Sequence, residues 1–219
     1  MLRNVLLAGG VLGAMAASAN AQLTIPLIDP STNAASGWEV VIFDPAHVDI
    51  VTDFVSLQNN RVVIQKFAEF NRIDPFTGAP EAVLIDFRQV AADAQTVSQI
   101  VITDERIINN TGLDWVDFEN ILVDSGQAVF NQGLMSDLSI APFTQQEFKN
   151  GGTLHRVFDG VVAAGATWLP GMAQGGIVID VDLSSDSPVI FTLKELPSVP
   201  APGSVALLAI GGLIARRRR

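Results

Sequence analysis

The chain alternates apolar and polar residues over short runs that are separated by turn signals. The clearest run, Ile177 to Leu183, places its odd-numbered apolar residues on one face and Asp180 and Asp182 on the other. Because successive side chains of a β-strand point to opposite faces, this pattern predicts a half-buried strand. Val189 to Leu193 repeats the pattern after the turn-rich segment Ser184 to Pro188, so the two runs are predicted to form a terminal hairpin.

Similar runs predict six earlier strands, separated by Asp-Pro, Asn-Asn and Asn-Thr-Gly turn signals and by a loop at residues 74–80. These predicted strands are Trp38 to Phe43, His47 to Leu57, Arg61 to Phe70, Glu81 to Gln89, Ile100 to Ile108 and Trp115 to Val123. Gln145 to Lys149 is predicted to form one helical turn, and no long stretch has the 3.6-residue period of a helix. Short strands with frequent turns favour an all-β fold, an antiparallel, jelly-roll-like β-sandwich.

The first 21 residues follow a different pattern. Arg3 precedes the apolar stretch Val5 to Ala17, and small residues follow it. A basic start, a short apolar centre and an A-x-A ending are typical of a secretory signal peptide. We expect a signal helix that signal peptidase removes at the A-x-A site Ala19-Asn20-Ala21, so that cleavage follows Ala21. The alternative site is Ala17-Ser18-Ala19, with cleavage after Ala19. An uncleaved anchor is less favoured, because these 13 apolar residues fall short of the roughly 20 that span a bilayer.

The C-terminal end is a second composite segment. It consists of Pro200, Ala201 and Pro202, then the apolar run Ser204 to Ala215, then Arg216, Arg217, Arg218 and Arg219. The apolar run predicts a helix about 18 Å long, against a hydrocarbon core of roughly 30 Å. Since arginine stems can snorkel, we expect a weak, transient anchor in the inner membrane. The positive-inside rule keeps the arginines cytoplasmic while the upstream chain is exported; the alternative is a helix packed on the domain.

This tail resembles the PEP-CTERM sorting signal of Gram-negative bacteria that have exosortase systems. In that family a Pro-Glu-Pro motif precedes an apolar helix and an arginine-rich terminus, and here Ala201 stands in the place of the glutamate. The resemblance covers about residues 198 to 219. It implies export, retention in the membrane through the tail, cleavage near Pro202 by an exosortase-type enzyme, and release to the cell surface or extracellular polymer. The expected organisation is a signal peptide (1–21), a secreted domain (22–197) and a sorting tail (198–219).

The composition excludes several classes of function. Of the 219 residues none is cysteine, so disulfides, thiolate metal sites and a cysteine nucleophile are absent. Without the two ends, residues 22–201 carry eight basic and 23 acidic residues, a net charge of about -15. Such a domain is soluble but repels anionic surfaces, so no nucleic-acid partner is expected. Extracellular polysaccharide remains an expected partner.

Candidate chemical sites are few. His47 and His155 are 108 positions apart and belong to no catalytic or metal-binding motif, so surface or hydrogen-bonded structural roles are expected. The carboxylates Asp114, Asp117 and Glu119 form the best candidate for a Ca²⁺ site, because calcium prefers several hard oxygen ligands. Further acidic pairs are Asp49 with Asp53 and Asp180 with Asp182. The absence of an EF-hand loop favours a solvated acidic face instead, and no cofactor is required.

The tryptophans Trp38, Trp115 and Trp168 suit either a core or a sugar-stacking platform. Trp168 is the best candidate for a platform, because Gly165 and Pro170 place it near a loop. Pairs of carboxylates suit glycoside hydrolysis, yet any acidic sandwich provides such pairs. The sequence therefore favours an exported, non-catalytic surface or matrix protein. The alternative is an exported carbohydrate-binding or glycan-hydrolysing domain.

Overall fold

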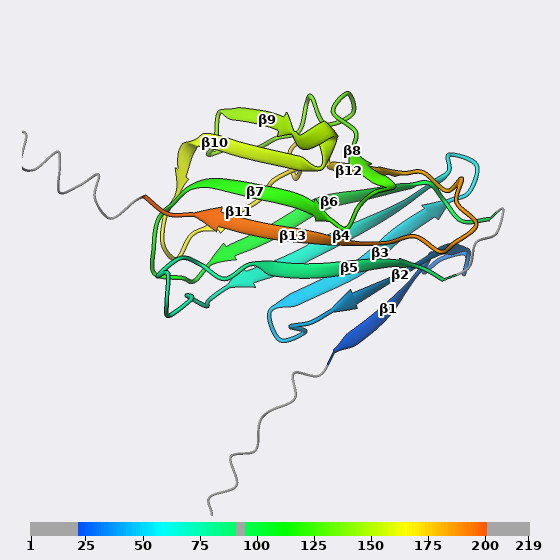
Figure 1. The fold of residues 1–219 in the computed structure, drawn as a ribbon, viewed down its shortest axis with the longest axis horizontal. Helices are drawn as coiled ribbons and strands as arrows, with labels where there is room; N and C mark the ends of the chain where they lie inside the picture. Colours follow the sequence, from blue (N-terminus) through cyan, green and yellow to red (C-terminus); the bar gives the residue numbers. More distant parts are fainter. Residues whose placement is uncertain (1–21, 91–94, 201–219) are drawn as a thin grey trace, which may run out of the picture.

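The computed structural model describes residues 22–90 and 95–200, which form an all-β domain without an α-helix (Figure 1). A single 3-10 turn, η1 (Asn150–Gly152), is the only helical element of these residues. The predicted signal helix (1–21) and the predicted tail helix (204–215) lie outside the described residues, as do Ala201, Pro202 and the terminal arginines. The described strands run from Leu23 to Ser198.

Seven strands form the first sheet, in the order β1-β2-β5-β13-β7-β10-β9. Every neighbouring pair in it is antiparallel. The strands are β1 (Leu23–Ile28), β2 (Ala35–Ile42), β5 (Val83–Gln89), β7 (Trp115–Val123), β9 (Gln145–Lys149), β10 (Leu154–Val162) and β13 (Ile190–Ser198). We call this the seven-stranded sheet.

The second sheet has six strands. Five of them follow the order β3-β4-β6-β12-β8, and β11 also pairs with β6. The strands are β3 (Val48–Ser56), β4 (Arg61–Phe70), β6 (Gln99–Asn109), β8 (Ala128–Phe130), β11 (Thr167–Trp168) and β12 (Ile177–Val181). Apolar side chains of this six-stranded sheet and of the seven-stranded sheet meet in one core, so the two sheets lie face to face (Figure 1).

The six predicted strands before residue 124 are confirmed, each within three residues of its predicted ends. The expectation that all pairs are antiparallel is wrong for one pair, because β4 and β6 run parallel. The chain leaves the six-stranded sheet after β4, forms β5 in the opposite sheet, and returns to lie beside β4. Such a crossover permits parallel neighbours, which a tight hairpin cannot provide.

Two further sequence predictions are wrong. Gln145–Lys149 forms strand β9 and not a helical turn, because β10 pairs with it along its whole length and satisfies its backbone groups. The predicted hairpin between the last two strands also does not form. β12 pairs with β6 and β8, whereas β13 pairs with β5 and β7 in the other sheet. The turn-rich segment between them is therefore a crossing from one sheet to the other.

The apolar core is divided into two clusters. The larger cluster includes Trp38, Phe87 and Phe191. The ring of Phe191 packs edge-on against Trp38 at a centroid distance of 6.0 Å and stacks on Phe87 at 5.2 Å. The smaller cluster surrounds Phe118, whose ring lies 5.0 Å from that of Trp168. Full burial of each such side chain contributes about 1.5–3 kcal/mol, so packing holds this cysteine-free domain together.

A layer of buried polar residues separates the two clusters. On β4, Lys66 lies between Ile64 of the larger cluster and Ala68 of the smaller cluster. The members of this polar layer are Lys66 (β4), Glu105 (β6), Asn120 (β7), His155 (β10) and Glu195 (β13), each at most 3% exposed. Glu195 is the register partner of Asn120, and Asn120 is the register partner of His155, so the layer continues across three strands.

Candidate functional site

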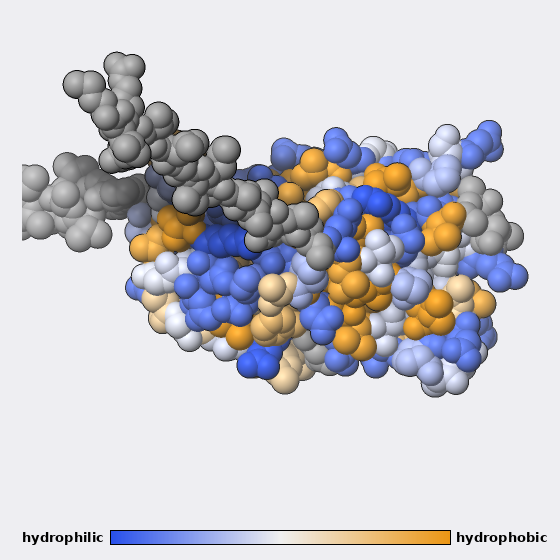
Figure 2. Space-filling model, turned by 90° about the horizontal axis from the view of Figure 1, so that it is seen from below, coloured by the Kyte–Doolittle hydropathy of each residue, from blue (hydrophilic) through white to orange (hydrophobic). Residues whose placement is uncertain are grey.

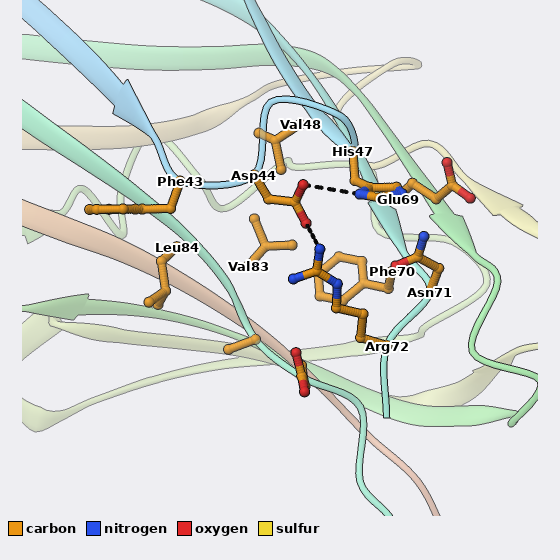
Figure 3. Close-up of a pocket in the computed structure, with 12 residues that line it drawn as sticks. Phe43, Asp44, His47, Val48, Glu69, Phe70, Asn71, Arg72, Val83 and Leu84 are labelled. Carbon is orange, nitrogen blue, oxygen red and sulfur yellow. Dashed lines mark hydrogen bonds and ion pairs between the residues drawn. The ribbon is translucent and has the colours of Figure 1, made fainter. Parts of the chain in front are cut away.

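The described residues enclose a surface pocket of about 150 Å³ beside the start of β3 (Figure 3). Three segments far apart in the sequence line it: the β2–β3 connection, the end of β4 with the residues after it, and the start of β5. Phe70, Val48 and Val83 form its apolar part, while charged side chains lie around it (Figure 3). Phe43 and Leu84 at its side are 40% and 42% exposed.

Asp44 is the central charged residue of the pocket. Its Oδ1 lies 3.1 Å from His47 Nδ1, and its Oδ2 lies 2.9 Å from an Arg72 terminal nitrogen (dashed lines in Figure 3). The backbone carbonyl of Asp44 accepts hydrogen bonds from the amides of His47 and Val48, which closes the turn that the Asp-Pro signal predicts. Asp44 therefore fixes both the cation and the imidazole in one orientation.

Two glutamates complete the polar lining. Glu69 accepts a 2.6 Å hydrogen bond from the Asn110 side chain, which reaches in from the turn after β6. Glu81 is held by its backbone, because its amide donates to the carbonyl of Arg72. The pocket therefore offers carboxylates, a guanidinium, an imidazole and an exposed phenyl ring within one small concavity.

This arrangement suits binding of a polar ligand. The Asp–His pair resembles the orienting half of a catalytic triad, but no Ser, Thr, Cys or Lys is among the residues that line the pocket. A triad needs such a nucleophile within hydrogen-bond reach of the imidazole. What the pocket does provide is hydrogen-bonding groups of both kinds around an apolar base, which is the usual character of a small-molecule site.

The predicted calcium ligands surround an arginine. Arg156 on β10 forms an ion pair with Asp117, and its guanidinium also lies 4.0 Å from Glu119 and 3.3 Å from Glu147. Asp114 is directed elsewhere, because its carboxylate accepts a 2.9 Å hydrogen bond from the Ala164 amide. A permanent cation thus lies beside two of the three candidates and offsets part of their negative charge.

In the part of the chain that is described, no group of three or more acidic or histidine side chains is placed to hold a metal ion. Asp180 accepts hydrogen bonds from Gln99 and Asn131, while Asp182 accepts one from the Ser184 amide. The Ser184 hydroxyl and amide together lower the pKa of Asp182. Asp49 and Asp53 are exposed on β3. Calcium binding by the acidic clusters stays a prediction.

The two histidines lie in unrelated places. His47 belongs to the pocket, whereas His155 is buried in the polar layer between Asn120 and Gln146, with ring-nitrogen distances of 3.2 and 3.1 Å. Burial lowers the pKa of His155 to about 4, so it is neutral at pH 7. The expected hydrogen-bonded structural role is confirmed for His155.

Trp168 is 3% exposed and donates its indole N–H to the carbonyl of Ile140 at 3.3 Å. Of the two alternatives for the tryptophans, Trp168 therefore has the core role and does not form a sugar platform. β11 pairs with β6 and turns the ring into the smaller cluster, although the loop residues around it are exposed. Trp38 and Trp115 are buried as well.

The polar layer contains a buried charged group that was not predicted from the sequence. Lys66 donates a hydrogen bond to Glu195 and lies 3.1 Å from Glu105 Oε1. Lys66 and Glu105 come from the six-stranded sheet and Glu195 from the seven-stranded sheet, so this contact crosses the core. The signal that identifies such a group is a charged residue at a position where the alternation of the strand predicts a buried side chain. Lys66 is such a residue in the alternating run Val62, Ile64, Lys66, Ala68.

No helix among the described residues is long and apolar enough to cross a membrane. No family model matches the chain, and no curated protein or solved structure shows a significant match to it.

Proposed function

We propose that this chain is an exported, non-catalytic protein of the cell surface or extracellular matrix, sorted through a PEP-CTERM-like tail. The supporting observation is the order of its segments. An all-β domain spans Leu23–Ser198, between a signal-like N-terminus and the proline-led, arginine-ended tail. Two facing sheets with a shared core support a jelly-roll-like β-sandwich, and tight packing suits an exported domain that has no disulfides.

The proposal is tested in a bacterium with an exosortase system, by cell fractionation and by the intact mass of surface-released protein. We expect the mature chain to begin at Gln22 and to lack residues beyond about Pro202. Deleting Arg216 to Arg219 is expected to abolish membrane retention, because the basic cluster holds the tail on the cytoplasmic side. Replacing the four arginines by lysines keeps the charge and is the matched control.

Two outcomes contradict this proposal. A released protein that still ends at Arg219 rules out C-terminal processing. Fractionation that is the same with and without the arginines rules out their role in retention.

A second candidate function, an exported carbohydrate-binding domain, is supported by the pocket. Sugars present hydroxyl groups that carboxylates and guanidinium groups bind in pairs, and their C–H faces pack on aromatic rings. Asp44 and Arg72 supply the first kind of contact and the exposed ring of Phe43 supplies the second. The ligand expected here is a neutral or basic saccharide, since three of the lining residues are acidic.

This candidate is tested by glycan-array binding and by sedimentation with extracellular polysaccharide. Phe43→Ala and Arg72→Ala are each expected to weaken binding about tenfold, which corresponds to about 1.4 kcal/mol. Phe76→Ala is the matched control, because Phe76 is 96% exposed but does not line the pocket. Equal losses in all three variants, or no binding by the wild type, contradict this function, and release of reducing sugar indicates the hydrolytic alternative.

A further inference from the structure

The buried cluster of Lys66, Glu105 and Glu195 contains more charge than it can neutralise. Two carboxyl groups face one ammonium group, and all three side chains are at most 4% exposed. Within the described residues, Glu195 Oε2 and Glu105 Oε1 have no hydrogen-bond partner. Buried ions of this kind carry a large desolvation cost, which a well-packed ion pair only partly offsets.

We propose that Lys66 and Glu195 condense into an intramolecular isopeptide bond, with Glu105 as the group that transfers the proton. Lys66 Nζ donates a hydrogen bond to Glu195 Oε1, so the nucleophile and the acyl group already touch. Glu105 Oε1 lies 3.1 Å from the same nitrogen and has no hydrogen-bond partner of its own, so it is within reach to accept a proton from the reacting amine.

The reaction balances without a cofactor. The Lys66 ammonium gives one proton to the Glu195 carboxylate, and the Nζ lone pair then attacks the Glu195 carboxyl carbon. The Glu105 carboxylate takes a second proton from the nitrogen and delivers it to the departing hydroxyl, which leaves as water. One C–N bond forms, one C–O bond breaks, and Glu105 returns to its starting state.

The electrostatics of the site agree with these roles. Burial raises the pKa of Glu105 to about 7, so this carboxyl group accepts and releases a proton near neutral pH. Burial alone lowers the pKa of Lys66, but the two carboxylates outweigh it and raise that pKa. The resting amine is therefore protonated and must lose its proton before it attacks. Condensation replaces two buried charges by a neutral amide, which removes their desolvation cost.

The bond joins the two sheets. Lys66 is on β4 of the six-stranded sheet, and Glu195 is on β13, the last strand of the seven-stranded sheet. If the proposed sorting function holds, a pull on the tail reaches β13 first, and the isopeptide bond transmits it to β4. In a chain without cysteine, such a bond supplies the covalent link that a disulfide otherwise provides.

The test is a tryptic peptide map of the purified full-length chain by tandem mass spectrometry, repeated after several days of incubation. Acylated Lys66 is no longer a cleavage site, so we expect one branched species. It consists of the peptide Val62 to Arg72 joined to the peptide that begins at Glu195, with the summed mass reduced by one water. Lys149 is the internal control, because it pairs with Glu147 at 2.7 Å but is 51% exposed and should stay cleavable.

Three results overturn the proposal. The first is full recovery of the separate peptides 62–66 and 67–72 from the incubated wild type, which shows a free lysine. The second is a branch to the peptide Gln89 to Arg106, which shows that Glu105 is the acyl partner. The third is a Glu105→Gln variant that still contains the bond between Lys66 and Glu195, which rules out proton transfer by Glu105. We expect Glu105→Gln to be unlinked, and Lys66→Arg, which keeps the charge without an amine, gives the unlinked reference map.

Discussion

His155 shows how one buried side chain makes the stability of the domain depend on pH. It is 1% exposed, stacks on Phe148 at 4.9 Å, and is hydrogen-bonded through both ring nitrogens. Because burial lowers its pKa to about 4, the folded state binds fewer protons than the unfolded state between pH 4 and about 6.5. The contribution of His155 is therefore complete above pH 6.5 and is lost as the pH falls to 4.

We expect acidification through this range to lower the free energy of unfolding by up to about 3 kcal/mol through His155. The measurement is urea unfolding at pH 7.5 and 4.5, followed by tryptophan fluorescence. His155→Gln removes the titrating ring but retains hydrogen-bonding capacity, so its loss of stability between the two pH values should be smaller by that amount. Glu105 contributes with the opposite sign, since its raised pKa favours the folded state at low pH, and it does so equally in both proteins. An equal loss in the variant and the wild type contradicts the assignment.

Single residues also show what the sequence can and cannot predict about sites. Lys66 lies on the same face of β4 as the buried apolar residues, and β4 was predicted correctly. The burial of Lys66 could therefore be predicted from the alternating pattern alone. Its partners were not, because Glu105 and Glu195 are 39 and 129 positions further along the chain. The same holds for Asp44 and Arg72, which meet only after the β2–β3 and β4–β5 connections come together.

At the scale of elements, the period-two pattern predicted which segments become strands but not which strands become neighbours. Alternation specifies the face that a side chain occupies, and this requirement is the same in either sheet. β12 and β13 therefore have the expected pattern and still belong to different sheets. β8 and β11 have three and two residues, which is too short for a pattern to emerge.

β10 was missed for a different reason. The register between β10 and β7 shifts between Phe158 and Val162, and Asp159 has a φ of 61° in this bulge. A Cβ atom on the next residue, Gly160, would lie 2.4 Å from the carbonyl oxygen of Pro142, so only glycine allows the approach of that loop. A bulge with a glycine interrupts alternation at the place where a strand would otherwise be recognised.

At the scale of the whole molecule, the surface mixes hydrophilic and apolar side chains and the net charge is strongly acidic. The face shown in Figure 2 has apolar side chains interspersed among hydrophilic ones. The net charge of about -15 for residues 22–201 favours solubility and opposes the compact state through self-repulsion. Arg156 counteracts this locally, because it lies among Asp117, Glu119 and Glu147.

The effects of NaCl and CaCl₂ on the melting temperature distinguish general screening of the acidic charge from specific binding of calcium. We expect the melting temperature to rise as NaCl is raised from about 10 mM to about 500 mM, because the Debye length falls from roughly 30 Å to below 8 Å. CaCl₂ at the same ionic strength should give no larger rise, since the Arg156 guanidinium already lies between the carboxylates of the best candidate cluster and offsets part of their charge. Differential scanning calorimetry measures both. A greater shift with calcium that Asp117→Asn abolishes would instead establish a calcium site there, and Asp53→Asn, on exposed β3, is the control for the loss of one surface charge.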